Sequence, residues 1–474
     1  MESQSRPFRR TLVLWTALGV ALRAGLLLLS GDLDLQSDEG NYVYLALLWN
    51  HFGVFFDAYR YLWPPGYVAF LAECLGAFGA AGLMAARWIQ VLASAAIGAS
   101  VMLLARRAFD ERAARLAGML WCVYLPLAAF THTFWNETLF LATFLPALLQ
   151  LLIVLQDGAR ARDRNVVLAA LFLALALYLK ELPLYYAAVL AALLFASGRR
   201  VSNVEGIRRA TLFALTLAAA HLPWGLRNLE VYGRFVPVGS SLGENVYVGL
   251  NGEYRNYDLR PFASRRVGLV EALPARAWFA DGPLADRWER AEEVLNAPDR
   301  FAENTRRGLA FAAEHPGWIA RSRVKKLADF ATPISFFVRH VALGHYAGTP
   351  LARPGLRHVL VLWAGLCPLL VLLGAGVGFF AALEDRAARW LFGSLFLYVL
   401  AATLLVAISR FRVPVIPLAI VLSAGLATRA LDSAQVRRRA LLPLVAFGAL
   451  LGFLWWVDAP ETWLVFRLAL GGGA

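Results

Sequence analysis

Acidic and basic side chains border long apolar stretches at a few positions of this sequence. The acidic pair Asp38-Glu39 follows the first apolar stretch, and Glu137 begins a later one. Lys180, Arg410 and Arg412 also border such stretches. A carboxylate can accept a proton from a hydroxyl group, and Lys or Arg can stabilise a departing phosphate. These residue types therefore indicate transfer of a group from a phosphate-linked donor to a hydroxyl group.

The composition places these charges in a membrane protein. Of the 474 residues, 59% are hydrophobic and 17% are charged, whereas soluble domains have roughly 45–50% apolar residues. The net charge of +13 would suggest nucleic-acid binding in a soluble chain, but here it reflects Arg in short connecting segments. We expect membrane lipids, and no nucleic acid, as partners. Cys74, Cys122 and Cys367 each lie alone in an apolar stretch, which predicts core residues rather than a disulfide or a zinc site.

Eleven segments are long and apolar enough to cross a bilayer, which takes about 20 residues each. They begin near Thr11, Trp88, Leu116, Thr138, Val166, Leu182, Ala210, Val359, Trp390, Val415 and Ala440. Every second connector is rich in Arg, and such connectors stay in the cytoplasm. The pattern predicts an all-α polytopic membrane protein with about eleven transmembrane helices, its N-terminus in the cytoplasm and its C-terminus outside. Residues 66–84, which include Glu73, are also apolar. If they crossed the membrane, all later Arg-rich connectors would lie outside, so we expect them to form a helix on or within the outer leaflet.

The alternation divides the chain into three parts. These are a transmembrane module at 1–226 with a first outer loop at 31–87, a large periplasmic loop at 227–357, and a C-terminal transmembrane module at 358–474. Within the large loop the sequence predicts helices at 284–296, 299–314 and 318–330. The last of these is amphipathic, as is typical of a helix at a membrane surface.

With this topology the charged and polar candidates gather on the outer side. For any one of them a simpler interpretation exists, because Ser37 or Asp38 can cap a helix and a cation can extend to lipid headgroups. A charged side chain at membrane depth costs about a few kcal/mol, however. Because charged residues from at least five connecting segments gather on the outer side, the sequence favours a polar site at the outer face. Nucleotide-linked sugars are absent there, which favours a polyprenyl phosphate carrier.

Several of these residues belong to short motifs, whose order along the chain is informative. The motifs are Asp38-Glu39 with Tyr42, Pro64-Pro65-Gly66-Tyr67, Arg87, Asn136-Glu137-Thr138-Leu139, Pro223-Trp224 with Arg227-Asn228, and residues 233–237, 245–251 and 410–417. In this order the sequence resembles the GT-C glycosyltransferases, specifically the bacterial branch of the dolichyl-phosphate-mannose protein mannosyltransferases that includes the lipid A aminoarabinose transferases. The resemblance covers nearly the whole chain. It departs at Lys180-Glu181, where relatives more often have Arg-Pro.

The resemblance implies a GT-C-like fold and an inverting sugar transfer from a polyprenyl (undecaprenyl) phosphate. The acceptor would be a hydroxyl group of a glycan, lipid or protein at the periplasmic side of a bacterial inner membrane. Asp38 would be the general base, with Glu39 beside it and Glu137 as a second acid. The expected phosphate-binding residues are Lys180, Arg227, Arg410, Arg412 and Lys326, and the expected pocket residues are Tyr42, Tyr67, His132 and Asn228. We expect no obligatory cofactor or metal, although some relatives bind a divalent metal.

Other functions fit parts of the pattern. A transporter or flippase of lipid-linked sugars would place charges along a path through the bilayer, where Arg23 and Glu73 are the ambiguous cases. An O-antigen ligase or polymerase also acts outside, but it would be expected to use Arg and His of a long outer loop. A noncatalytic scaffold explains least of the pattern. The clustering of charges at one face favours an enzyme.

Overall fold

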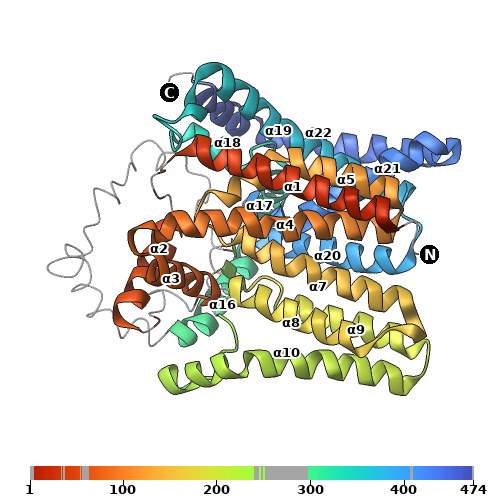
Figure 1. Ribbon diagram of the computed structural model, residues 1–474, viewed down its shortest axis with the longest axis horizontal. Helices are drawn as coiled ribbons and strands as arrows, with labels where there is room; N and C mark the ends of the chain where they lie inside the picture. Colours follow the sequence, from red (N-terminus) through yellow and green to blue (C-terminus); the bar gives the residue numbers. More distant parts are fainter. Residues whose placement is uncertain are drawn as a thin grey trace.

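The computed structural model describes residues 5–31, 33, 35, 38–53, 55, 63–239, 245–246, 249–250, 297–405 and 409–471, and the account below concerns these residues. Every regular element among them is helical, as predicted. The long helices lie side by side along the longest axis of the molecule, and α2, α3 and α16 lie toward one end (Figure 1).

Eleven helices form the main bundle, and each predicted apolar segment falls on one of them. They are α1 (Ser5–Ser30), α4 (Gly82–Ala108), α5 (Glu111–Val123), α7 (Glu137–Asp157), α8 (Asp163–Leu179), α9 (Tyr186–Arg199), α10 (Asn203–Tyr232), α19 (Pro354–Ala381), α20 (Arg386–Leu405), α21 (Ile416–Asp432) and α22 (Ala434–Ala469). Seven stretches of the described chain are long and apolar enough to cross a membrane, or up to eight with the bent pair Glu111–Val123 and Leu125–Thr131. The chain is thus a multi-span membrane protein, but a count of eleven crossings is not confirmed.

Shorter helices connect and cover the bundle. They are α2 (Asp38–Phe52), α3 (Gly66–Phe78), α6 (Leu125–Ala128), α16 (Ala297–Glu314), α17 (Pro316–Ala331) and α18 (Phe336–Ala342), with 3-10 helices η1 (Gly79–Ala81), η2 (Ala129–Thr131), η3 (Gly158–Arg160), η4 (Pro350–Ala352) and η5 (Ser409–Val415). The helices predicted at 299–314 and 318–330 are confirmed as α16 and α17, whereas 284–296 lies outside the described residues. The expected amphipathic helix, α17, packs against α22, where Trp455 donates a hydrogen bond to the Ala331 carbonyl (2.9 Å).

Helix α3 folds back beside α4. The Tyr67 hydroxyl donates to Gln90 Oε1 at 2.9 Å, although a straight helix would place residues 23 positions apart at about 35 Å. The turn requires a glycine at Gly82, because a Cβ there would lie 2.6 Å from Leu75 Cα. Residues 66–84 therefore do not extend α4 in a straight line, and whether they cross the membrane stays open.

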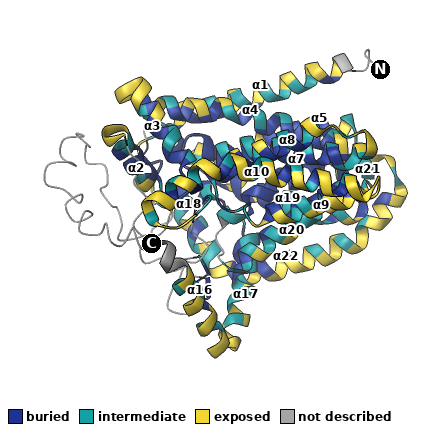
Figure 2. Cartoon of the chain, turned by 90° about the horizontal axis from the view of Figure 1, so that it is seen from below, coloured by how far each residue is buried: buried dark blue, intermediate teal, exposed yellow. Residues whose placement is uncertain are grey.

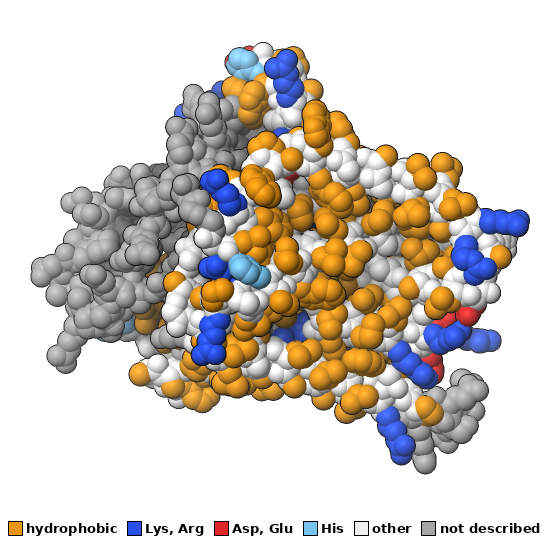
Figure 3. Space-filling model, turned by 90° about the horizontal axis from the view of Figure 1, so that it is seen from above, with side chains coloured by type: hydrophobic (Ala, Val, Ile, Leu, Met, Phe, Trp, Pro, Cys, Tyr) orange, Lys and Arg blue, Asp and Glu red, His pale blue; other side chains and the backbone are white. Residues whose placement is uncertain are grey.

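The outer surface of the bundle is apolar. Leu442 and Trp456 on α22 expose 77% and 73% of their surface, and exposed residues run along the outward sides of α1 and α22 in Figure 2. In the view of Figure 3 hydrophobic side chains cover much of the surface, and Lys and Arg lie mainly toward its edges. In a membrane protein such a surface faces lipid tails rather than water. Cys74, Cys122 and Cys367 are buried and free, as predicted.

Ion pairs connect several Arg-rich connectors at one end of the bundle. Arg106 stacks on Phe8 near the start of α1, and Arg107 pairs with Asp157 at the end of α7. Further pairs there are Arg208–Asp163, Arg112–Asp432 and Arg429–Glu384. Because α7 begins and α8 ends at the other end of the bundle, the predicted acidic and phosphate-binding residues on these helices lie far from this basic end.

Candidate active site

Asp38 begins α2 and contacts a cation from a distant part of the chain. Arg410 Nη1 donates to Asp38 Oδ2 at 3.1 Å. Arg410 lies in η5, between α20 and α21, and its guanidinium stacks on the Trp135 ring at 4.4 Å. Such a cation–π contact fixes the plane of the guanidinium and favours its charged form. The Asp38 carboxylate and the Arg410 guanidinium therefore share one site, although they lie far apart in the sequence.

Glu137 holds two cations with a single carboxylate oxygen. Lys180 Nζ donates to Glu137 Oε1 at 2.7 Å, and Arg410 Nε lies 3.5 Å from the same atom. The Glu137 side chain is fully buried. Burial lowers the pKa of Lys180, and the charge of Glu137 opposes this shift in part. Asp38, Arg410, Glu137 and Lys180 therefore form a chain of alternating charge, called the cavity cluster below.

Three members of the cavity cluster line an open cavity. Its lining residues are Asp38, Tyr42, Trp63, Pro64, Asn136, Lys180, Glu181, Leu182, Tyr185, Asn245, Tyr398, Ala402, Leu405, Arg410 and Phe411. Of the predicted site residues, Asp38, Tyr42, Lys180 and Arg410 therefore meet at one cavity. The cavity combines aromatic rings with few charged groups, as is usual for small-molecule sites.

Asn136 is a cavity residue outside the predicted site set, although it belongs to one of the predicted motifs. Its Nδ2 donates to the Tyr42 hydroxyl (3.1 Å) and to the Leu179 carbonyl (2.6 Å). It thereby ties α2 and the end of α8 to the start of α7. Glu181, Tyr185, Asn245 and Tyr398 also line the cavity. Glu181 was visible as a departure from the family motif, whereas the two tyrosines lie in apolar stretches with no distinguishing signal.

Glu39 turns away from the cavity lining. It is 2% exposed, its Oε1 accepts a hydrogen bond from the Phe134 backbone N–H (2.6 Å), and its Oε2 lies 4.0 Å from His345 Nε2. Burial lowers the pKa of His345 to about 4, so this histidine is neutral at pH 7 and the contact is not an ion pair. Glu39 thus anchors the first turn of α2 and positions Asp38 rather than facing the cavity.

Two predicted pocket residues bond to other groups. His132 Nε2 is 2.7 Å from the Tyr346 hydroxyl, and burial lowers the pKa of His132 to about 3. Tyr67 bonds to Gln90, as described above. Neither side chain lines the cavity, so the structure supports structural roles for both.

Arg227 and Asn228 form a separate polar group at the end of α10. Arg227 donates to Asn228 Oδ1 (2.9 Å) and to the Phe55 carbonyl (3.0 Å), and it stacks on Trp224 at 4.9 Å. Asn228 Nδ2 donates to the Val236 carbonyl at 2.7 Å. The described contacts do not bring this pair to the cavity.

Arg412 and Lys326 bond to backbone carbonyls. Arg412 Nη1 donates to the carbonyls of Phe330 (2.9 Å) and Thr332 (2.6 Å), and its side chain is buried away from the cavity. Lys326 donates to the carbonyls of Gly249 (2.6 Å) and Leu405. Burial lowers the pKa of Lys326 to about 7. Because Leu405 lines the cavity, Lys326 lies just behind its wall, whereas Arg412 holds α17 to η5.

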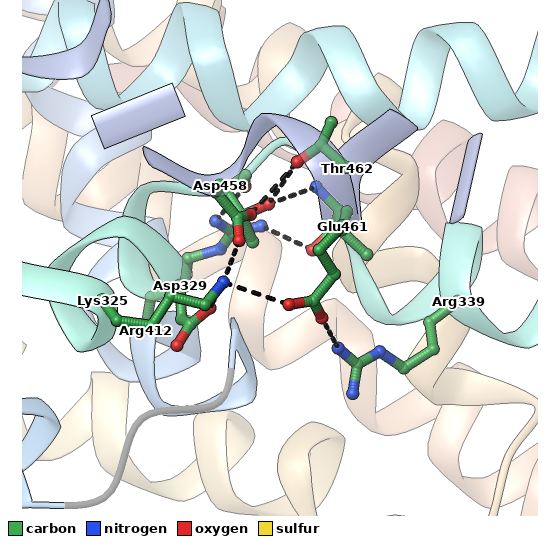
Figure 4. Close-up of polar contacts among 9 residues, drawn as sticks. Lys325, Asp329, Arg339, Arg412, Asp458, Glu461 and Thr462 are labelled. Atoms are coloured by element: carbon green, nitrogen blue, oxygen red, sulfur yellow. Dashed lines mark hydrogen bonds and ion pairs between the residues drawn. The ribbon is translucent and has the colours of Figure 1, made fainter. Parts of the chain in front are cut away.

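A group of acids with ligand atoms close enough to hold a metal lies elsewhere. In the described part of the chain this group is Asp329, Asp458 and Glu461. Lys325 Nζ contacts all three carboxylates (Figure 4). An ammonium group therefore already occupies the position that a cation would take, and the residues do not fit a metal centre.

Comparison with known proteins adds to this geometry. Residues 63–224 match the dolichyl-phosphate-mannose-protein mannosyltransferase family, and no curated protein sequence matches the chain. The structure resembles that of AglB, an archaeal oligosaccharyltransferase from Archaeoglobus fulgidus in complex with an inhibitory peptide and a dolichol-phosphate. The two are 14% identical with a TM-score of 0.53, over 100% of this chain and 57% of AglB. The chain has the GT-C glycosyltransferase fold.

Two further structures are similar to this chain. The Archaeoglobus fulgidus oligosaccharyltransferase tethered with an acceptor peptide is 16% identical, with a TM-score of 0.50 over 98% of this chain and 56% of that one. ArnT from Cupriavidus metallidurans, bound to undecaprenyl phosphate, is 15% identical, with a TM-score of 0.40 over 95% and 88% of the two chains. The chain thus spans about 57% of the length of AglB. The family matched over residues 63–224 and the fold are both those of glycosyltransferases, which confirms the resemblance to that family and to the GT-C fold, whereas the bacterial branch stays a prediction.

Proposed function

We propose that this chain transfers a sugar from a polyprenyl phosphate-linked donor to an acceptor hydroxyl group, at the periplasmic face of a bacterial inner membrane. The observation that carries the proposal is the cavity cluster. A carboxylate, Asp38, and two cations, Lys180 and Arg410, line one cavity, although they come from three distant parts of the chain. A general base beside a phosphate-binding pair is the arrangement that this transfer requires.

The reaction exchanges one bond at the anomeric carbon for another. The acceptor oxygen bonds to that carbon while the bond from the carbon to the phosphate oxygen breaks, and the polyprenyl phosphate leaves with the bonding electron pair. Asp38 accepts the proton of the acceptor hydroxyl group. Lys180 and Arg410 stabilise the charge that develops on the phosphate. One base suffices for such a displacement, which inverts the configuration at the anomeric carbon.

Glu137 assembles the cation pair in this scheme. Its one oxygen lies 2.7 Å from Lys180 Nζ and 3.5 Å from Arg410 Nε, so it holds two like charges near one another. It is fully buried and does not line the cavity. We therefore assign Glu137 a positioning role instead of that of a second acid acting on the substrate.

The donor phosphate competes with Asp38 for Arg410. Arg410 bonds to Asp38 at 3.1 Å, and a phosphate that binds to the guanidinium takes over part of this bonding. Donor binding then leaves Asp38 available to accept a proton from the acceptor. This favours donor binding before proton transfer.

The fold comparison supports a lipid-linked donor. The AglB structure with the same fold contains a dolichol-phosphate and a peptide, and a phosphate on a membrane-anchored lipid suits a cavity at the end of a transmembrane bundle. A transport function is less well supported, because the two charged residues considered for a path through the bilayer have other surroundings. Arg23 in α1 donates to the carbonyls of Gly19 (3.0 Å) and Trp121 (3.2 Å) and stacks on the Trp121 ring, and Glu73 is exposed on α3.

The test is sugar transfer by the purified protein in liposomes. Radiolabelled polyprenyl phosphate sugars are supplied with glycan, lipid and peptide acceptors, and the products are separated by thin-layer chromatography. We expect labelled acceptor and free polyprenyl phosphate. Movement of an intact labelled donor across the bilayer, with no bond broken, would instead establish a flippase and overturn the proposal.

A further inference from the structure

Asn136 lies at the wall of the cavity, and its amide group is fixed in one orientation. The side chain is buried. Its Nδ2 lies 2.6 Å from the Leu179 carbonyl oxygen and 3.1 Å from the Tyr42 hydroxyl oxygen. Because a carbonyl oxygen only accepts hydrogen bonds, the amide must turn its nitrogen toward Leu179. Both N–H groups of the Asn136 side chain therefore donate to groups of the protein.

The two acceptors of Asn136 belong to the elements that carry the proposed base and one of the cations. Tyr42 follows Asp38 by four residues in α2, so the two side chains lie on one face of that helix. Both line the cavity. Leu179 ends α8 and directly precedes Lys180. One amide side chain thus joins the helix of Asp38 to the segment of Lys180.

Glu39 gives α2 another anchor, but with a different partner. Its Oε1 accepts a hydrogen bond from the Phe134 N–H at 2.6 Å, which ties the first turn of α2 to the segment before α7. This bond does not involve the end of α8. Asn136 adds the link from the next turn of α2 to Leu179. The distance between α2 and the end of α8 therefore depends on Asn136.

Ion pairs form a second route from Asp38 to Lys180. Asp38 pairs with Arg410 at 3.1 Å, Arg410 Nε lies 3.5 Å from Glu137 Oε1, and Glu137 pairs with Lys180 at 2.7 Å. On the proposed function the donor phosphate binds to the two cations and takes over part of this bonding. The hydrogen bonds of Asn136 join neutral groups, which the phosphate does not compete for. They therefore persist while the ion pairs change.

We propose that Asn136 is a positioning residue, which keeps Asp38 at the correct distance from Lys180 during sugar transfer. This inference rests on the proposed function. The acceptor oxygen, the anomeric carbon and the departing phosphate oxygen must lie in line, and a displacement of about 1 Å can cost about a hundredfold in rate. The donor phosphate is bound by the cations rather than by Asn136. Loss of Asn136 should therefore slow the transfer step while donor binding stays the same.

The experiment measures donor binding and single-turnover transfer separately. The protein in liposomes is loaded with a radiolabelled polyprenyl phosphate hexose, and the acceptor that the wild type uses is then added. The rate is expressed per bound donor, so that unfolded protein does not contribute. Asn136→Ala should slow this rate by about thirtyfold. It should change the equilibrium Kd for the donor by less than about threefold, because the cations remain.

Tyr42→Phe tests the same link from its other end. It keeps the ring and removes one of the two acceptors of Asn136, so it should slow the rate per bound donor by about fivefold. The double variant should be at most about twofold slower than Asn136→Ala, because residues that share one interaction do not act additively. Tyr42→Phe also provides the test if Asn136→Ala does not fold, since it removes only one oxygen atom.

Asn50→Ala is the matched control on the same helix. Asn50 Nδ2 donates to the Ala72 carbonyl of α3 at 3.4 Å, and neither residue lines the cavity. This variant should leave the rate per bound donor and the Kd unchanged, because it removes a link of α2 that does not reach Lys180.

The outcomes separate this inference from the proposed reaction. A wild type that transfers sugar, with a rate per bound donor that neither Asn136→Ala nor Tyr42→Phe lowers, overturns the inference and leaves the proposed function standing. Losses that multiply in the double variant, or a loss confined to donor binding, overturn it as well. A wild type that binds the donor but transfers no sugar contradicts the proposed function, and this inference with it.

Discussion

Two clusters of ion pairs use the same residue types in different surroundings. The cavity cluster opens onto a cavity through Asp38, Lys180 and Arg410. The second cluster joins α17 to α22, and it consists of Lys325, Asp329, Asp458 and Glu461 (Figure 4). None of its members lines that cavity. We call it the α17–α22 cluster.

The two lysines differ in how firmly their charge is fixed. At Lys325 burial opposes ionisation, but Asp329, Asp458 and Glu461 outweigh it and raise the pKa of the ammonium group. At Lys180 burial outweighs Glu137, and the pKa is lowered. An anionic ligand would therefore stabilise the charged form of Lys180, whereas Lys325 already has its counter-ions. Charged residues alone do not mark an active site. An active site also needs access for a ligand, and cations whose charge the neighbouring carboxylates do not fully balance.

Asp38→Asn should produce the largest effect at the cavity cluster. The amide cannot accept a proton as the carboxylate does, so we expect sugar transfer to fall by on the order of a thousandfold. The measurement is transfer from a polyprenyl phosphate sugar in liposomes. The thermal midpoint in detergent should stay near that of the wild type, because Asp38 is partly exposed and its one described ion pair is near the surface.

Glu73→Gln is the matched control for this loss. It removes an exposed carboxylate from the neighbouring helix α3 and should leave transfer intact. Near-normal turnover in Asp38→Asn would remove Asp38 from the role of general base. In that case the cavity cluster would resemble the α17–α22 cluster, a set of ion pairs with a structural role.

Lys325→Ala should be the most damaging change in the α17–α22 cluster, and it should act on stability. It leaves three carboxylates together, two of them almost fully buried, and removal of one partner from a buried pair costs about 3 kcal/mol or more. We expect a lower thermal midpoint and less protein in the membrane. Transfer per folded molecule should be unchanged.

Arg321→Ala provides the comparison on the same helix. Arg321 is exposed, so its loss should change stability by at most about 0.5 kcal/mol. A Lys325→Ala protein that is as stable as Arg321→Ala would show that the α17–α22 cluster contributes little. A loss of specific activity in Lys325→Ala, with stability retained, would place it in the catalytic machinery and contradict the distinction between the clusters.

The sequence predicts the helices better than it predicts the directions of side chains. Apolar length and the alternation of basic connectors locate all eleven bundle helices, because burial in lipid demands long apolar segments whatever their neighbours. Of the predicted site residues, Asp38, Lys180 and Arg410 line one cavity. These three residues border helix ends, where a short connector leaves few directions for the side chain.

The predicted site residues differ from the cavity lining where neighbouring residues share a motif but not a direction. Arg410 and Arg412 are two positions apart, yet η5 turns one toward Glu137 and the other toward the carbonyls of α17 and the segment after it. Asp38 and Glu39 diverge in the same way at the start of α2. Tyr398 lies within an apolar stretch, and only the packing of α20 against the 181–185 turn reveals that it lines the cavity. Such contacts depend on tertiary packing, which no local pattern encodes.

Arg410→Ala should reduce use of the lipid donor without unfolding the protein. It removes a charge-assisted contact with the phosphate, worth about 2 kcal/mol, or roughly thirtyfold in kcat/KM for the donor. Arg112→Ala, which breaks an exposed ion pair with Asp432 at the basic end, should leave these kinetics unchanged. Unchanged donor kinetics in Arg410→Ala would exclude Arg410 from the phosphate-binding pair.

The smallest expected effect is a pH dependence of stability that comes from Lys326 and not from its neighbour Lys325. Burial lowers the pKa of Lys326 to about 7, below the value of about 10.4 in an unfolded chain. Between these values the unfolded state binds more protons than the folded state, so the free energy of unfolding rises with pH, by about 1 kcal/mol from pH 7 to pH 8. A neutral amine still has two N–H groups for the carbonyls of Gly249 and Leu405.

Thermal unfolding in detergent at both pH values measures this difference. The midpoint of the wild type should rise between pH 7 and pH 8 relative to Lys326→Met, which has no group to titrate there. Lys325→Ala should retain this rise, because the raised pKa of Lys325 keeps that ammonium group charged in both conditions. Parallel pH curves for the wild type and Lys326→Met would mean that Lys326 stays fully charged behind the cavity wall, as a permanent cation available to the donor phosphate.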